Sequence, residues 1–231
     1  MRAELVRITT ARRLVAEGVG TALLVAAVVG SGIMAEQLAH GDAATALLAN
    51  TIATGAALVA ILLMFGPVSG AHLNPAVTVS LAVTREITPR MAAGYVAVQV
   101  AGGIAGCVLA NAMFDLTAIS WSLHARAGAP QLLSEAVATF GLMGVVVAVG
   151  RTRPAAAPFA VAAYIVAAYW FTASTSFANP AVTIARAFSD TFAGIRPVDA
   201  PAFIAAQAIG AAAGSVLFGW LVPKPIIATV M

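Results

Sequence analysis

The chain has 231 residues, of which 61% are hydrophobic and 9% are charged, and its formal net charge is +3. This composition excludes a soluble globular protein, and the small basic surplus predicts no surface for nucleic acid. A mean hydropathy of +0.96 is typical of an integral membrane protein, so the lipid bilayer is the first partner that we expect. The single cysteine, Cys107, can form neither an intrachain disulfide nor a multi-cysteine metal site.

Six apolar segments approach the ~20 residues that a helix needs to cross the hydrocarbon core. We predict membrane spans at residues 13–35, 45–65, 90–114, 131–150, 156–173 and 201–222. The first of them could be mistaken for a signal peptide. Because it is long and contains Glu17, we expect it to remain in the mature fold.

Two shorter segments begin at a repeated motif, Asn-Pro-Ala-Val-Thr, which starts at Asn74 and again at Asn179. Asparagine is a favoured N-cap and proline is tolerated in the first helical turn, so each motif predicts the start of a helix. Each segment lasts about ten residues, which is too short for a crossing. We therefore predict two re-entrant half-helices, which begin at Asn74, Pro75 and Ala76 and at Asn179, Pro180 and Ala181.

Basic residues are unevenly divided between the two sides of the predicted membrane protein. The more basic side receives Arg2, Arg7, Arg12, Arg13, Arg85, Arg90, Arg151, Arg153 and Lys224. The other side receives Arg126, Arg186 and Arg196. Because positive residues favour the cytoplasmic side, both termini are expected to be cytoplasmic.

The chain is predicted to be one channel domain, residues 1–231, that contains two repeats at about 10–114 and 131–222. An outer loop, 115–130, joins them. The recurring positions are Glu17 and Thr21 with Glu135 and Thr139, and Gln99, Gly102 and Gly106 with Gln207, Gly210 and Gly214. Each repeat holds three crossings, an odd number, so the repeats are inverted and the half-helices enter from opposite faces. Irregular backbone at that depth must line a watery path or be buried in protein.

The half-helix N-termini would meet near the midplane, where each carries about +0.5 of an elementary charge and disfavours cations. The amides of Asn74 and Asn179 could donate hydrogen bonds to a passing hydroxyl compound. Backbone carbonyls of the segments that lead into the motifs could accept from it. These candidate pore-lining carbonyls belong to Gly70, Ala71, His72, Ser176 and Phe177.

Three titratable side chains are predicted to lie inside the membrane, and two interpretations of each are possible. Glu17 and Glu135 could relay protons, since an intramembrane acid is costly and often functional, or they could accept hydrogen bonds from the re-entrant loops and support them. We expect loop support. His72 could be a pH sensor or a metal ligand, but no second His or Cys is positioned beside it. We expect a structural histidine, no metal and no cofactor.

The paired motifs, the lead-in from Ser69 to Leu73, the two glutamates and the glycine-rich spans that contain Gln99 and Gln207 resemble the aquaporin, or major intrinsic protein, family over nearly the whole chain. The resemblance implies an all-α integral membrane protein with six transmembrane helices and two re-entrant half-helices in an inverted repeat. It also implies a passive pore in each subunit of a homotetramer. The sequence contains no serine–histidine or histidine–glutamate motif of an intramembrane protease, so we expect no enzymatic activity.

The sequence departs from this family three residues after the second motif asparagine, where water- and glycerol-selective members usually carry arginine. Here the residue is Val182. Counting from the motifs, the resemblance assigns the other positions of the selectivity filter to Thr54, Ala167 and Ser176. A ring of these four small uncharged residues should be wider and less polar, and so admit larger neutral solutes.

Arg186 lies four residues beyond Val182, on the same helical face and one turn nearer the outer mouth. It could partly replace the missing charge. We expect instead a solvated or ion-paired residue at the vestibule, with Asp190 as its partner.

The small ring, together with residues 179–186 and 190–194, resembles a bacterial aquaglyceroporin-like subgroup associated with arsenic resistance operons. It implies a channel in the bacterial inner membrane for water, glycerol-like polyols, arsenite and methylated arsenicals. Two alternatives remain: a strict water channel, and an ion-coupled secondary transporter, which also has inverted repeats and broken helices.

Overall fold

The computed structural model describes residues 8–224, and every one of its regular elements is a helix. They are α1 (Thr10–Leu38), α2 (Ala43–Ser69), α3 (Pro75–Val83), α4 (Pro89–Met113), α5 (Ala129–Thr152), the short 3-10 helix η1 (Pro154–Ala156), α6 (Ala157–Phe171), α7 (Pro180–Arg186) and α8 (Ala200–Leu221). Six of these helices, counting η1 with α6, are long and apolar enough to cross a membrane. The predicted all-α architecture is confirmed. Arg2 and Arg7, counted above as basic residues, lie outside the described residues.

Local sequence explains where several helices begin. The side chains of Thr9, Asp42 and Thr88 each accept a hydrogen bond from a backbone N–H group in the first turn that follows. The two short helices, α3 and α7, have asparagine caps with proline at the first position, as the motifs predict.

Two helix pairs, α1 with α4 and α5 with α8, pack closely at corresponding glycines. A Cβ atom added to Gly102 would lie 2.1 Å from the carbonyl oxygen of Gly18, and one added to Gly210 would lie 2.1 Å from that of Ala136. Only glycine allows the backbones to approach so closely. The same contact therefore holds each half of the molecule together.

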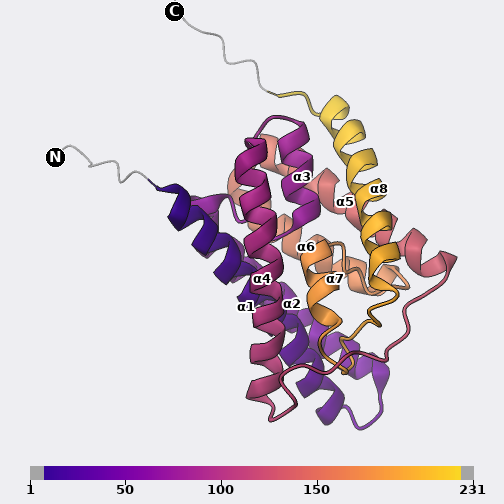
Figure 1. The fold of residues 1–231 in the computed structure, drawn as a ribbon. Helices are drawn as coiled ribbons and strands as arrows, with labels where there is room; N and C mark the ends of the chain where they lie inside the picture. Colours follow the sequence, from indigo (N-terminus) through magenta and orange to yellow (C-terminus); the bar gives the residue numbers. More distant parts are fainter. Residues whose placement is uncertain (1–7, 225–231) are drawn as a thin grey trace, which may run out of the picture.

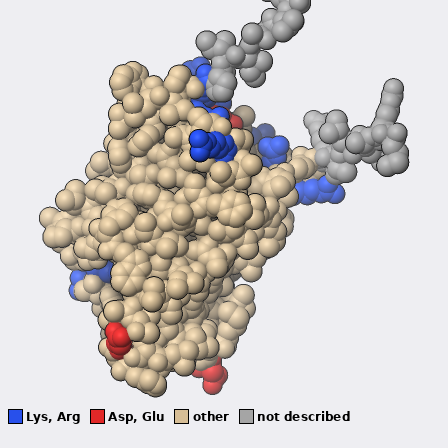
Figure 2. Space-filling view, turned by 180° about the vertical axis from the view of Figure 1, so that it is seen from behind, with Lys and Arg blue, Asp and Glu red and all other residues tan. Residues whose placement is uncertain are grey.

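The two short helices lie between these pairs and point toward each other from opposite ends of the bundle (Figure 1). The first turn of α1 and the last turn of α8 lie at the upper end in this view, and the connection from α4 to α5 crosses the lower end. Lys and Arg side chains gather at the end of the molecule where the described chain begins and ends, at the first turn of α1 and the last turn of α8, and Asp and Glu side chains are seen at the opposite end (Figure 2). The broad surface between them carries few charges.

That surface exposes large apolar side chains, as lipid contact requires. On α8, for example, Trp220 is 76% exposed and Val216 is 75% exposed. In contrast to these apolar side chains, the carboxylates of Glu17 and Glu135 are completely buried. The interior of the bundle thus holds these two polar groups away from the lipid-facing surface.

Candidate functional site

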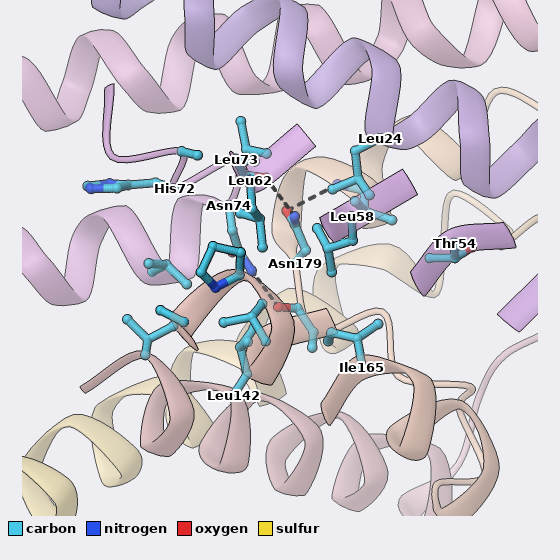
Figure 3. Close-up of a pocket in the computed structure, with 18 of the residues that line it drawn as sticks. Leu24, Thr54, Leu58, Leu62, His72, Leu73, Asn74, Leu142, Ile165 and Asn179 are labelled. Carbon is cyan, nitrogen blue, oxygen red and sulfur yellow. Dashed lines mark hydrogen bonds between the residues drawn. The ribbon is translucent and has the colours of Figure 1, made fainter. Parts of the chain in front are cut away.

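A cavity of about 400 Å³ lies along the middle of the bundle, with walls from α1, α2, α5 and α6 and from both re-entrant segments (Figure 3). Gly150 and Pro154 line it near the end that carries the termini, and Thr54 and Arg186 line it toward the opposite end. Its walls therefore reach into both halves of the membrane-spanning bundle. Most of the side chains between these ends are apolar, including Leu24, Leu58, Leu142 and Ile165.

Asn74 and Asn179 lie together at the centre of this cavity (Figure 3). Their Oδ1 atoms cap the short helices, accepting from Ala76 N at 2.9 Å and Ala181 N at 3.0 Å. This use of the oxygen fixes which way each amide points. The Nδ2 atom of Asn74 donates to Ala178 O at 2.8 Å, and that of Asn179 donates to Leu73 O at the same distance. Each NH₂ group has a second hydrogen, which remains for a ligand in the cavity.

The segments that lead into the motifs have an unusual backbone. Ala71 and Leu73 in the first, and Ser176 and Ala178 in the second, have φ between 46° and 51°. Non-glycine residues in this left-handed region cost on the order of 1–3 kcal/mol each, so surrounding contacts must hold them. No backbone hydrogen bond in the described chain ends on the carbonyls of these segments, whose residues line the cavity. The arrangement leaves backbone acceptors beside the asparagine donors.

Glu17 holds the first lead-in segment. Its Oε1 accepts from His72 N at 2.9 Å and Ser69 Oγ at 2.6 Å, and its Oε2 accepts from Leu73 N at 2.7 Å. The Nε2 of Gln99 donates to the same carboxylate at 2.7 Å. These four hydrogen bonds hold the irregular backbone of the segment against α1 and α4.

Glu135 makes the equivalent contacts in the second half. It accepts from Phe177 N at 2.9 Å, Ala178 N at 2.8 Å and Gln207 Nε2 at 2.6 Å. Neither this carboxylate nor that of Glu17 lines the cavity. Both carboxylates thus accept hydrogen bonds from the irregular backbone that leads into the motifs.

His72 lines the cavity, with its Nδ1 3.1 Å from Thr78 Oγ1 and its ring edge-on to Tyr95. Among the residues that the structure describes, no group of three or more His, Cys, Asp or Glu could hold a metal ion.

Of the four residues assigned to the outer filter, Thr54, Ser176 and Val182 line the cavity. The assignment of Ala167 is wrong, because this residue is exposed on the outer surface of α6. The face of α6 that does line the cavity carries Pro158, Val161, Ile165 and Tyr169, at helical spacing. Tyr169 occupies the level of the filter, and its hydroxyl lies 3.4 Å from the Thr54 hydroxyl. The ring therefore contains an aromatic side chain and is not made of small residues alone.

The expectation for Arg186 is also wrong. Arg186 is 2% exposed, lines the cavity and stacks on Phe177, with Cζ 3.4 Å from the ring centroid. Its Nε donates to the carbonyl of Ala193. Asp190, the proposed partner, accepts instead from Leu123 N at 2.8 Å. The outer segment after α7 folds back over the arginine, which removes it from solvent.

Arg126, which the sequence identifies only as a basic residue of the outer loop, is buried and makes several hydrogen bonds at the outer end of the protein. Its Nε donates to Gly194 O at 2.8 Å, and its Nη groups donate to Ser174 O and Phe192 O at 3.3 Å. Burial lowers the pKa of this guanidinium to about 10, so it stays charged at neutral pH. Arg126 thus ties the loop between the halves to the second re-entrant segment. No local sequence pattern marked this role.

Comparisons with known proteins agree with this arrangement. A family model described as major intrinsic protein matches residues 4–167. The chain is 55% identical over 218 residues to the aquaglyceroporin AqpS of Rhizobium meliloti (strain 1021), covering 94% of this chain and 93% of that protein. It is 34% identical over 191 residues to the aquaporin TIP1-2 of Zea mays, covering 77% and 74%.

The fold is similar to the X-ray structure of the aquaglyceroporin from Plasmodium falciparum, with a TM-score of 0.68 over 92% of this chain and 95% of that one. The identity there is 20%, so this likeness concerns the fold alone. From the family model and the relatives, the chain belongs to the major intrinsic protein family, whose members are membrane channels and not enzymes.

Proposed function

We propose that this protein is a passive channel for small neutral solutes: water, glycerol-like polyols and metalloid hydroxides such as arsenite, together with methylated arsenicals. The observation that carries the proposal is the cavity that contains the free amide hydrogens of Asn74 and Asn179 beside unused backbone carbonyls. A hydroxyl group both donates and accepts, so it is matched there on both sides. The name of the 55% identical relative, an aquaglyceroporin, supports the same class of solute.

The width of the outer filter carries the finer part of the proposal. Val182 stands where water- and glycerol-selective relatives usually carry arginine, and it lines the cavity with Thr54 and Ser176. A shorter, uncharged side chain leaves room for a solute larger than water and lowers the cost of removing its hydration shell. Arsenite is an uncharged trihydroxy compound at neutral pH and would use the contacts of a polyol.

Ion coupling has little support in the geometry. A coupled transporter needs a site that binds an ion in one state and releases it in another. Both buried carboxylates are occupied by hydrogen bonds to the re-entrant segments, and neither lines the cavity. The positive ends of α3 and α7 also oppose cations at the centre.

The test is solute influx into liposomes that contain the purified protein, followed by stopped-flow light scattering. Water, glycerol and arsenite should each equilibrate faster than in empty vesicles. The rates should not change when a proton or sodium gradient is imposed. Influx that follows such a gradient would show that the protein is an ion-coupled transporter and not a passive channel.

A strict water channel is the second candidate, and Tyr169 is the observation that favours it. The aromatic ring of Tyr169 lies at the level of Thr54 and narrows the filter. The filter expected from the sequence contained only small side chains. In the liposome experiment this candidate predicts fast water flux with glycerol and arsenite rates equal to those of empty vesicles.

We further propose that the protein lies in the bacterial inner membrane as a homotetramer, with both termini in the cytoplasm. The positive residues gathered at the end that carries the termini support this orientation. Fusing a reporter that fluoresces only in the cytoplasm to the C-terminus tests it, since a dark but membrane-inserted fusion would reverse the topology.

A further inference from the structure

Arg186 has the properties of a functional charge. It is buried, and none of the three salt bridges in the described part of the chain involves it. The only hydrogen bond that its side chain makes to residues 8–224 runs from Nε to Ala193 O, which leaves both Nη groups without a protein acceptor. Phe177 fixes the plane of the guanidinium by stacking. The terminal N–H groups of a cavity-lining cation are therefore available to a ligand.

A second polar group without a partner lies in the same cavity. Ser176 is 3% exposed, lines the cavity and has an Oγ atom that makes no hydrogen bond within the described chain. Buried hydroxyls are nearly always hydrogen-bonded, so an unpaired one beside a cavity indicates a water or solute position. Its backbone φ of 51° shows that the surrounding fold holds the residue in place.

The hydroxyls of Thr54 and Tyr169 line the cavity as well, 3.4 Å from each other. Val182 lies one helical turn before Arg186 on α7 and is apolar. Its short side chain carries no charge that would repel the guanidinium. The positive charge of the outer filter has thus moved one turn along the helix toward the outer end.

We propose that Arg186, and not a residue at position 182, supplies the fixed positive charge of the outer filter, and that its Nη groups and the Ser176 hydroxyl form a binding subsite for hydroxylated neutral solutes. The inference deepens the proposed function and rests on it. Arg186 acts as a selectivity residue in two ways: its charge excludes small organic cations that have the size of the accepted solutes, and its N–H groups donate to solute oxygens.

The first experiment compares methylammonium and glycerol influx into liposomes for wild type, Arg186→Gln and the matched control Arg196→Gln. Arg196 lies on the same side of the protein but is paired with Asp199 and does not line the cavity. Removing an unscreened charge from a narrow pore should raise methylammonium permeability by about tenfold in Arg186→Gln. Wild type and Arg196→Gln should both exclude the cation. Equal exclusion by all three folded proteins would overturn the proposal.

A second pair of variants tests the subsite without removing the buried charge. Ser176→Ala should lower the ratio of glycerol to water permeability by about threefold, the loss of one hydrogen bond to a solute. Ser215→Ala is the control, because Ser215 lies on α8, does not line the cavity, and its Oγ donates to Ala211 O at 2.7 Å. Equal ratios in the two variants would overturn the subsite even if Arg186→Gln did not fold. Failure of the proposed function is distinct, since wild type itself would then pass no glycerol.

Discussion

Glu135 illustrates how one residue sustains an irregular backbone at membrane depth. Its carboxylate accepts from two consecutive backbone N–H groups, Phe177 N and Ala178 N, of which the second belongs to a residue with φ of 46°. Water cannot satisfy these groups within the hydrocarbon region. The buried acid therefore replaces the secondary structure that the segment lacks.

Glu135→Gln should destabilise the protein by about 1–3 kcal/mol, because the new amide group turns an N–H toward buried donors and leaves at least one unpaired. Thermal unfolding in detergent, followed by circular dichroism, measures the effect. Glu36→Gln is the control, since Glu36 is exposed and accepts one bond, from Phe192 N. Equal shifts for the two variants would contradict the support role.

Gly106 gives a second prediction at this scale. Gly106→Ala should cost about 1–3 kcal/mol, because its Cβ would lie 2.1 Å from Ala22 O and would force α1 and α4 apart. Gly219→Ala on α8 meets nothing within 4 Å and should leave the unfolding midpoint unchanged. The comparison fails if both substitutions are tolerated equally.

The sequence identified both residues of the central asparagine pair but misassigned one wall of the filter. Asn74 and Asn179 are marked by their own local motif. The assignment of Ala167 depends on counting back from Asn179 across the irregular residues 172–178. The face of α6 that meets the cavity is determined instead by packing against α2 and α5. A one-dimensional count cannot supply that rotation, so Tyr169 was missed.

Among the larger elements, the segment that follows α7 determines the environment of the outer mouth. Arg126 and Arg196 both contact Asp199 at the start of α8: Arg126 N donates at 2.9 Å, and Arg196 Nε donates at 2.9 Å. The Arg196 side chain, followed by the Arg126 N–H, lowers the pKa of the Asp199 carboxyl below its ordinary value despite partial burial. The segment thus depends on an ionised Asp199.

A pH dependence follows from this contact. Because the folded pKa lies below the unfolded value, the stabilisation is complete above about pH 4 and is lost as pH falls through the folded pKa. The protection of the backbone amides near Arg126 against hydrogen exchange, relative to the intrinsic rate at each pH, should therefore be lost only below the ordinary pKa of an aspartate carboxyl. Asp199→Asn should show the faster exchange already at pH 7. Wild-type protection that is unchanged far below the ordinary pKa of an aspartate carboxyl would contradict this dependence.

The helices themselves were predictable, since hydropathy and caps locate them within a few residues. The way in which residues 187–199 fold back over Arg186 was not predictable from the sequence. It depends on contacts with the loop between the halves, such as Ser122 N to Ala187 O at 3.0 Å, which join residues far apart in the sequence. Hence an arginine expected in solvent lies in the pore.

For the molecule as a whole, the inverted repeat places one network of Glu, Gln and Thr on each side of the midplane. Gln99 Nε2 donates to Thr78 Oγ1 at 2.9 Å, and Gln207 Nε2 donates to Thr183 Oγ1 at 2.8 Å. The halves differ in the side chains beside the re-entrant segments: His72 packs on Tyr95 in the first, whereas Phe177 packs on Phe203 and stacks on Arg186 in the second. The Glu, Gln and Thr contacts that the two halves share support both re-entrant segments. The aromatic and arginine contacts that differ give the outer end its own environment.

Oligomeric state is a prediction at the same scale. The apolar surface of α8 and its neighbours can be covered by lipid or by another copy. Following the family resemblance, we expect four copies, each with its own pore. Native mass spectrometry from detergent should give a tetramer, and a mass of one chain under mild conditions would contradict this.

The most direct test of a wide neutral-solute pore is glycerol and arsenite influx into liposomes that contain wild type or Val182→Arg, measured against empty vesicles. The substituted side chain would enter the cavity one turn from Arg186, where it narrows the filter and adds a second charge. The account predicts fast influx of both solutes in wild type and strong suppression by the substitution, with water flux largely retained. Unchanged glycerol and arsenite rates in a folded Val182→Arg protein would contradict it.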